Sequence, residues 1–228
     1  MTFSLVARCP HSGQFGVAAL TGTPGVGKLL TWARRRVGAV ATQGWINPYL
    51  GVDALALLGH DHPAEKVLEA VVAMDDGRDL RQLGLVDRHG MTATWTGKDC
   101  AAWAGSRCGD GWVAAGNLLE SGDTLDASAA AFARASEAAL VERLMAALEA
   151  GDAAGGDTRG SRSATVYVVD TEEYPLWDVR VDDHDRPLAE LRRVKDLFES
   201  ELIPQIRKLP TRENTLGDLA SDSREGLA

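Results

Sequence analysis

Strand-like segments occur in pairs along this chain, and each pair is joined by a few turn-forming residues. Apolar runs at 3–7 and 15–20 flank Cys-Pro-His-Ser-Gly-Gln, and residues 83–95 hold Asp-Arg-His-Gly between two alternating segments. A third pair, 164–170 and 177–183, brackets Thr-Glu-Glu-Tyr-Pro-Leu. A short turn joins only antiparallel neighbours, whereas a parallel crossover needs a dozen residues or more. The pattern therefore predicts antiparallel sheets and not a series of βαβ units.

Helical segments fall in blocks between these strand pairs. Residues 63–74 carry apolar side chains at helical spacing, and Pro63 suits a first helical turn. Residues 124–151 are rich in alanine and predict a helix that is interrupted near Ser136, and 187–208 predict the last helix. Further strands are expected at 37–45 and 111–119. The expected fold class is α+β with antiparallel sheets.

Length and composition favour one globular domain. The chain has 228 residues, of which 45% are hydrophobic, enough for a core of ordinary size. We expect a single domain over residues 1–210 and a flexible C-terminal tail at 211–228, where apolar periodicity ends. The sequence shows neither a secretory signal nor an apolar run long enough for a membrane span, so a cytoplasmic protein without a membrane partner is expected.

Charge and metal-ligand patterns exclude several kinds of partner. The formal net charge is −9, which disfavours nucleic acid, and the dense basic run at 32–36 is interpreted as a solvated helix end. Three cysteines show no zinc-ligand spacing and are too few for a disulfide framework. His60 and His62 lie just before the helix predicted from Pro63, so a loop and helix cap explain them better than a metal site. We expect no metal.

The stretch from Gly22 to Lys28 reads G-x-x-x-x-G-K, the pattern of a phosphate-binding loop. Such a loop needs Ser or Thr after the lysine to bind Mg²⁺, and here that position is Leu29. The few residues from Leu29 to the strand expected at 37 are also too few for a crossover helix. A strand-to-helix connection is the favoured interpretation, and a nucleotide-dependent switch on residues 22–28 is the weaker alternative.

A different chemistry is suggested by Met1 and Thr2. Initiator methionine is commonly removed when the second residue is small, which would leave Thr2 with a free α-amine. The unperturbed pKa of that amine is about 7.7–8.0, so it can act as a base for the threonine hydroxyl near neutral pH. Taken alone, this pattern is weak, because many inert proteins begin with Met-Thr.

Ordered segments over most of the chain resemble the domain-of-unknown-function family numbered 1028. They include TFSLVAR, WARRRVGAVATQGWINP, TGKDCAAWAG and LMAALEAGDAAGGDTRGSRSA, and the resemblance runs from Thr2 to about Leu191. That family is assigned to the Ntn-hydrolase (N-terminal nucleophile) superfamily, whose fold is a four-layer αββα sandwich. The resemblance implies that Thr2 is the nucleophile of a hydrolase cleaving an amide or related C–N bond in a small molecule or short peptide. The expected enzyme needs no cofactor and is a homo-oligomer.

Supporting residues are assigned from their types and places. Asn117 follows a small-residue strand and is the first choice for a catalytic oxyanion donor. Arg159 is expected to clamp a substrate carboxylate, and Asp157 to orient Arg159 or to bind a substrate amine, although the two side chains could merely close their loop. The predicted substrate-binding set is completed by Gln43, Asn47 and Lys28. Gln43 and Asn47 are also alternatives to Asn117, and Asn47 before proline is equally well explained as turn chemistry.

The chain also departs from the family pattern. No acidic residue follows the second strand, Arg162 stands where the family usually has Gln, and Cys9 stands where it has an acid. These departures keep a second reading open, in which the chain retains the Ntn fold and binds a small ligand without catalysis.

Overall fold

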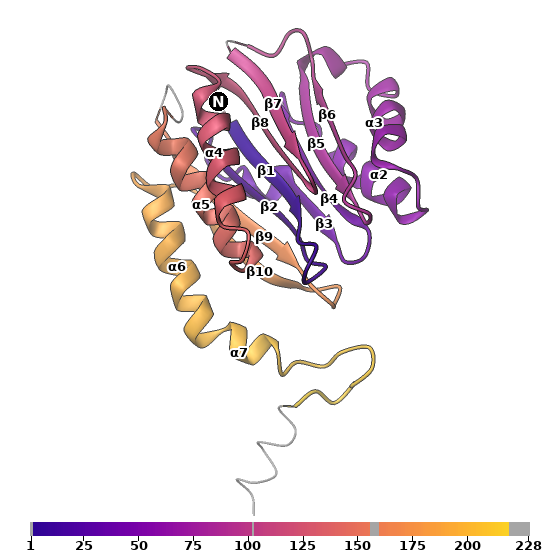
Figure 1. Ribbon diagram of the computed structural model, residues 1–228, viewed down its shortest axis with the longest axis vertical. Coiled ribbons are helices and arrows are strands. Elements are labelled where there is room, and N and C mark those ends of the chain that lie inside the picture. The colour runs from indigo at the N-terminus through magenta and orange to yellow at the C-terminus, as the bar shows by residue number, and fades with distance from the viewer. Residues whose placement is uncertain (1, 102, 156–159, 219–228) are drawn as a thin grey trace, which may run out of the picture.

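Two antiparallel β-sheets form the centre of the molecule in the computed structural model, which describes residues 2–101, 103–155 and 160–218 (Figure 1). The strand order is β10-β9-β2-β1-β8-β7 in the larger sheet and β3-β4-β5-β6 in the smaller one. The larger sheet consists of β1 (Thr2–Arg8), β2 (Phe15–Thr21), β7 (Trp103–Gly109), β8 (Trp112–Leu119), β9 (Ser163–Val169) and β10 (Pro175–Val181). The smaller sheet consists of β3 (Thr31–Arg34), β4 (Gly38–Gly44), β5 (Arg81–Asp87) and β6 (Thr92–Thr96).

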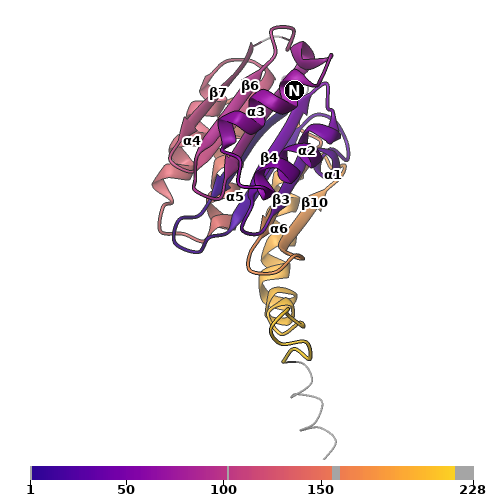
Figure 2. The same cartoon turned by 90° about the vertical axis from the view of Figure 1, so that its right-hand side faces the viewer.

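Helices cover the outer face of each sheet (Figures 1 and 2). The larger sheet is covered by α4 (Asp123–Arg134), α5 (Leu140–Ala153) and α6 (Pro187–Glu201), and the smaller by α2 (Pro48–Gly59) and α3 (Ala64–Ala73). Shorter helical turns are α1 (Gly27–Leu30), η1 (Arg78–Leu80) and α7 (Ile203–Ile206). Separate apolar clusters fill the space between each sheet and its helices and the space between the two sheets.

The central strand β1 is buried on both faces, and its alternation divides its side chains between two of these clusters. Phe3, Leu5 and Ala7 pack toward α4 and α5. Val6 belongs to the cluster between the sheets, so Thr2, which lies on the same face of the strand, also points toward the smaller sheet. Hydrogen-bonded neighbours on both sides, β2 and β8, hold β1 in register.

The structure confirms the antiparallel arrangement and the main local predictions. The three expected hairpins are β1–β2, β5–β6 and β9–β10. The alanine-rich helix is interrupted between Arg134 and Leu140, as the sequence around Ser136 predicted. The basic run at 32–36 was wrongly interpreted as a helix end, because it begins in β3 and ends in the turn to β4. Strands β3 and β7 and helix α2 were not predicted.

The chain beyond the sheets runs through α6 and α7 into residues 211–218. The backbone N–H of Thr211 donates to the backbone oxygen of Asn214 (2.8 Å). The hydroxyl of Tyr174 donates to the backbone oxygen of Pro210 (3.1 Å). Residues 219–228 of the predicted tail lie outside the described residues. Across the described ranges, no helix combines the length and apolar character that crossing a membrane requires.

Candidate functional site

Thr2 begins β1, with its side chain in the layer between the two sheets. The residue is 8% exposed. Its hydroxyl oxygen Oγ1 lies 3.0 Å from Oγ1 of Thr21, which is its Cα partner on β2. On the other side, its Cα partner on β8 is Asn117. The structure therefore brings the predicted nucleophile and the predicted oxyanion donor together on adjacent strands.

Three amide side chains form a buried group beside Thr2, which we call the amide cluster: Asn117, Gln82 and Gln43. Asn117 Nδ2 donates to Gln82 Oε1 (3.0 Å), and Gln43 Nε2 donates to the same oxygen (2.8 Å). The exposed fractions of these residues are 4%, 0% and 1%, respectively. The cluster thus links β8 of one sheet to β4 and β5 of the other, and its member Asn117 is the strand partner of Thr2.

Gln82 was not predicted from the sequence. Its signal was the alternation in β5, where Gln82, Gly84 and Val86 share the face that packs on the larger sheet. A long polar side chain at such a position must find hydrogen-bond partners inside the protein, because water cannot reach it. A glutamine on a buried strand face, level with another glutamine on β4, was therefore a sign of a polar site between the sheets.

A β-bulge shapes the strand end that carries Asn117. The pairing of β7 with β8 passes from Gly105–Gly116 to Trp103–Leu119, so two residues of β8 oppose one of β7. The second of these, Leu118, has a φ of 57°, which a branched side chain rarely adopts. Bulges and such strained residues are concentrated near functional sites, where they re-aim side chains. Here the bulge lies at the Asn117 position itself.

Two buried oxygen atoms near Thr2 have no hydrogen-bond partner among the described residues: Ser4 Oγ and Gln43 Oε1. Ser4 lies on the same face of β1 as Thr2. The side chains gathered here, from Thr2, Thr21 and the amide cluster, are all uncharged. Any base for the Thr2 hydroxyl would therefore have to come from outside these side chains.

The structure gives Asn47 and Lys28 other surroundings. Asn47 caps α2, with its side chain accepting from the backbone N–H of Tyr49 (3.1 Å), as the turn interpretation expected. Lys28 is exposed and lines a separate hollow of about 240 Å³ with Trp32 and Tyr167, away from the amide cluster. Its loop leads through the four-residue helix α1 into the antiparallel strand β3, so it lacks the long crossover helix of a phosphate loop.

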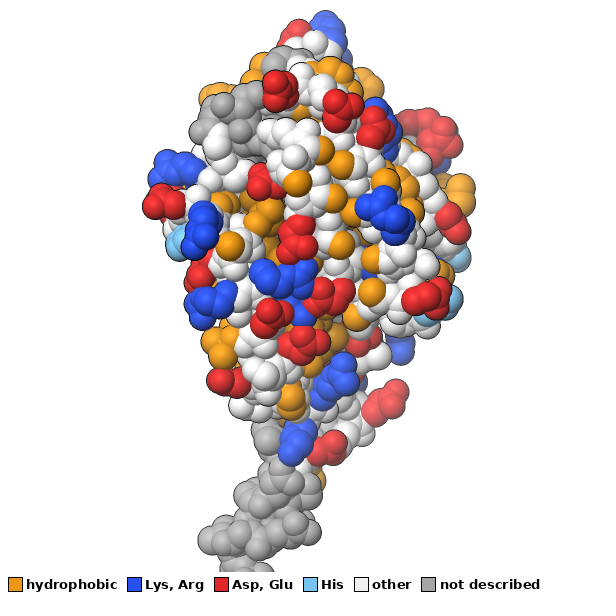
Figure 3. All heavy atoms as spheres, turned by 60° about the vertical axis from the view of Figure 1, so that its left-hand side comes forward, with side chains coloured by type: hydrophobic (Ala, Val, Ile, Leu, Met, Phe, Trp, Pro, Cys, Tyr) orange, Lys and Arg blue, Asp and Glu red, His pale blue; other side chains and the backbone are white. Residues whose placement is uncertain are grey.

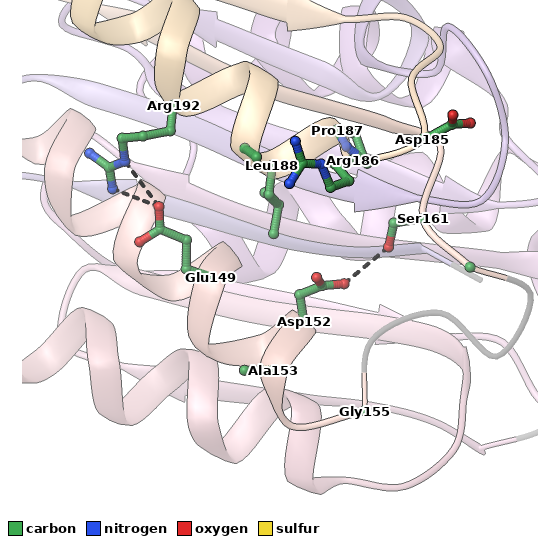
Figure 4. A pocket seen from close by; sticks show the side chains of 12 residues that line it. Glu149, Asp152, Ala153, Gly155, Ser161, Asp185, Arg186, Pro187, Leu188 and Arg192 are labelled. Atoms are coloured by element: carbon green, nitrogen blue, oxygen red, sulfur yellow. Dashed lines mark hydrogen bonds and ion pairs between the residues drawn. The ribbon is translucent and has the colours of Figure 1, made fainter.

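Asp157 and Arg159 lie outside the described residues. The glycines that flank their loop, Gly155 and Gly160, line a pocket of about 700 Å³ between the end of α5 and the start of α6 (Figure 4). In this pocket Ser161 Oγ donates to Asp152 Oδ1 (3.1 Å). Thr2 does not line it. We therefore place the candidate chemistry at the strand end and not in the pocket.

Arg162, which follows this loop in the chain, nevertheless lies beside the strand partner of Thr2. The backbone N–H of Arg162 donates to the backbone oxygen of Thr21 (2.8 Å), which is the strand partner of Thr2. The side chain of Arg162 makes an exposed ion pair with Asp183 (2.8 Å). Strand β9, which follows Arg159 in the chain, therefore begins beside Thr21, the strand partner of Thr2.

Carboxylates of Glu142, Asp196 and Glu199 converge closely enough to suggest a cation site. The ammonium group of Lys195 already lies among them: Nζ contacts Glu142, and lies 2.5 Å from Glu199 Oε2 and 3.4 Å from Asp196 Oδ1. Because a positive charge occupies this position, we assign no metal to it. In the region of His60 and His62, Asp61 pairs instead with Arg88 (3.2 Å).

Comparisons with known proteins place the chain in a family. No curated protein matches it. The crystal structure of a DUF1028 protein from Silicibacter pomeroyi is similar to it with a TM-score of 0.87 and 30% identity, covering 95% of this chain and 94% of that one. Anbu (ancestral beta-subunit) from Yersinia bercovieri aligns with a TM-score of 0.38 and 13% identity, over 89% of this chain and 97% of that one. The family of unknown function DUF1028 matches residues 2–191, and the chain belongs to this family.

Proposed function

We propose that this chain is an Ntn hydrolase that cleaves an amide or related C–N bond of a small molecule or short peptide. Thr2 is its nucleophile once Met1 has been removed, and the two sheets with their covering helices are the four-layer αββα sandwich of that superfamily. One observation carries the proposal. The Thr2 hydroxyl lies at the start of a central strand, 3.0 Å from the Thr21 hydroxyl and across from Asn117, in the layer between the sheets.

The proposed reaction uses the α-amine of Thr2 as base. The amine takes the proton of Oγ1, directly or through a water, and Oγ1 attacks the substrate carbonyl carbon. Collapse of the tetrahedral intermediate breaks the C–N bond, and the leaving amine takes the proton from the α-ammonium. Water then cleaves the ester on Oγ1 and releases the acid. In this scheme Asn117, which has a second N–H, donates to the developing oxyanion, and no cofactor takes part.

Substrate binding is assigned to groups around the strand end. Gln43 contributes a buried amide from the cluster beside Thr2. Arg159 would hold a substrate carboxylate, and Asp157 would orient Arg159 or bind a substrate amine. The assignment of Arg159 and Asp157 is supported by the hydrogen bond from the backbone N–H of Arg162 to the backbone oxygen of Thr21. Asn47 and Lys28 are not included in this proposal, because Asn47 caps a helix and Lys28 lines a separate hollow.

The alternative function is small-ligand binding without catalysis. The observation that favours it is that the described side chains grouped with Thr2, namely Thr21 and the amide cluster, are uncharged and include no base. The two functions are separated by the Thr2→Ala variant. A hydrolase loses turnover and keeps ligand affinity, whereas a binding protein shows no turnover in either form.

We also propose that the protein is a homo-oligomer. Trp45, Tyr49 and Met74 are 76%, 73% and 68% exposed. Trp45 lies next to Leu80, which is 44% exposed, because the backbone N–H of Trp45 donates to the backbone oxygen of Leu80 (3.0 Å). Exposed apolar groups of this size mark interaction surfaces. In sedimentation velocity, Trp45→Asp should shift an oligomer toward monomer, while Leu216→Asp, exposed elsewhere, should not. A monomeric wild type would remove this assignment.

The first experiment is the intact mass of untagged protein from its native host, followed by an amide substrate panel. A mass lacking one methionine together with amide release that Thr2→Ala abolishes is the expected result. Thr23→Ala, a change at an exposed threonine nearby, is the matched control and should keep wild-type turnover. Retention of Met1 would block the α-amine from acting as base and would remove the proposed mechanism.

A further inference from the structure

Gln82 is completely buried between the sheets, and the backbone of the larger sheet fixes how its amide group is turned. Gln82 Nε2 donates to the backbone oxygens of Gly116 (2.9 Å) and Gly105 (3.1 Å) and to Thr96 Oγ1 (3.0 Å). A backbone oxygen can only accept, so the amide nitrogen must face β7 and β8 and the amide oxygen must face away from them. The glycines lie beside the bulge, where the β7–β8 pairing shifts.

The Gln82 oxygen in turn fixes two other side chains. Oε1 accepts from Asn117 Nδ2 (3.0 Å) and from Gln43 Nε2 (2.8 Å). Because Oε1 has no proton to donate, both neighbours must present their nitrogen atoms to it. Turning either amide by half a rotation would bring two oxygen atoms face to face in a buried site. Orientation therefore passes from the strand backbone through Gln82 to Asn117.

Asn117 is the Cα partner of Thr2, so its orientation bears directly on the candidate nucleophile. With one N–H of Nδ2 bonded to Gln82, the second N–H points in a direction that the first one determines. We propose that Gln82 is a positioning residue for the acylation of Thr2: it holds the Asn117 amide so that its second N–H can donate to the oxyanion. This inference rests on the proposed function, because it requires Thr2 to be the nucleophile.

A β-lactone probe tests the inference without knowledge of the natural substrate. Thr2 Oγ1 attacks the lactone carbonyl, the ring C–O bond breaks, and the proton from Oγ1 ends on the released alkoxide as a hydroxyl group. The product is a Thr2 ester, and the intact mass rises by the whole mass of the lactone. Acylation rates at increasing lactone concentration give a limiting rate and a half-saturating concentration for each variant.

Wild type should be acylated at Thr2 and Thr2→Ala should not. Gln82→Met removes the amide and keeps the side-chain length, so the limiting rate should fall roughly 10- to 100-fold, the effect of misplacing a catalytic group. The half-saturating concentration should change by a smaller factor, because Gln82 acts on ligand binding only through its hydrogen bond with Gln43. Gln205→Met, which alters an exposed glutamine, should match wild type in both values. A residue that only joined the sheets would not separate the two values in this way.

A second variant and a second measurement keep the test decisive. Gln82→Asn keeps a polar group but shortens the side chain, so it should fold and still lower the limiting rate. In NMR spectra, the side-chain amide protons of Asn117 should exchange slowly in wild type and faster in both variants. Wild-type limiting rates in a folded Gln82 variant would overturn the inference alone. A folded wild type that the lactone does not acylate would remove the proposed function, and the inference with it.

Discussion

Two buried polar groups of this protein solve the same physical problem in opposite ways. The amide cluster lies between the sheets, is uncharged, and is satisfied largely by backbone oxygens and by its own members. The second group, which we call the ionic cluster, joins α5 to α6 and consists of Lys195, Arg192, Glu142 and Glu199. Acidic and basic side chains lie side by side over this helical face (Figure 3).

The difference between the two clusters follows from access to water. Lys195 is 2% exposed, whereas the side chains of its partners Glu142 and Glu199 are 34% and 59% exposed. The buried ammonium group is therefore paired with carboxylates that remain partly hydrated, which lowers the desolvation cost of the ion pairs. The side chains of the amide cluster are almost completely buried, so a charge in their place would be far more costly. We infer that the ionic cluster serves stability, and that the amide cluster, beside Thr2, serves chemistry.

The largest effect that would test this division is on catalysis. Asn117→Ala should lower the Thr2 acylation rate about 100-fold, the usual loss when one oxyanion donor is removed. Folding should persist, because Gln43 still donates to the Gln82 oxygen. The lactone assay gives the rate, and Asn214→Ala, at an exposed site, is the control. An unchanged rate would show that the amide cluster is only structural, and the inferred difference in role between the two clusters would be wrong.

The sequence could predict the local part of this site but not its assembly. Hairpins such as β1–β2 were predictable, because alternation and turn residues act over a few positions. The pairing of β1 with β8 joins residues more than a hundred positions apart, so no local signal placed Asn117 opposite Thr2. Asn117 was nevertheless proposed, from its place after a small-residue strand.

The elements that were not predicted have weak or misread signals. Strand β7, Trp-Ala-Gly-Ser-Arg-Cys-Gly, is only partly buried and lacks apolar alternation. Helix α2 starts with Asn47 and Pro48, which the sequence interpretation took for a turn, although an Asn cap followed by proline also begins helices. Gln82 was overlooked because a single polar residue in a strand has no motif, and its role depends on Gly105 and Gly116 from the other sheet.

A smaller effect is expected from the ionic cluster, and on stability alone. Lys195→Met would leave the Glu142 and Glu199 carboxylates without their shared cation, which should lower the free energy of unfolding by about 1–2 kcal/mol. This lies below the cost of breaking a fully buried pair, because both carboxylates remain partly solvated. Urea unfolding measures the change, and the Thr2 acylation rate should stay at the wild-type value. A lower acylation rate in Lys195→Met would show that the ionic cluster also contributes to catalysis, contrary to the division of roles inferred above.

The pH dependence of stability should separate the clusters further. Burial raises the pKa of Glu142, but hydrogen bonds from Lys195 and Arg192 lower it more, so the net pKa lies below its ordinary value of 4.5. Such a group stabilises the fold above 4.5, and this contribution is lost as the pH falls through the folded-state pKa. The stability difference between wild type and Lys195→Met should therefore narrow as the pH falls from about 6 to about 3. A constant difference would mean that Lys195 acts through packing and not through charge.

The smallest effect is expected from an ion pair on the same helix that lacks burial. Arg193 makes a two-pronged pair with Glu190 one turn away, and both distances (2.7 and 2.8 Å) are those of good hydrogen bonds. Its side chain is 63% exposed, so water competes for both partners. Arg193→Ala should leave the melting temperature within measurement error, at low and at high salt, while Lys195→Met lowers it at both. A clear loss from Arg193→Ala would show that pairing geometry, and not burial of the lysine, sets the stability of this helical face.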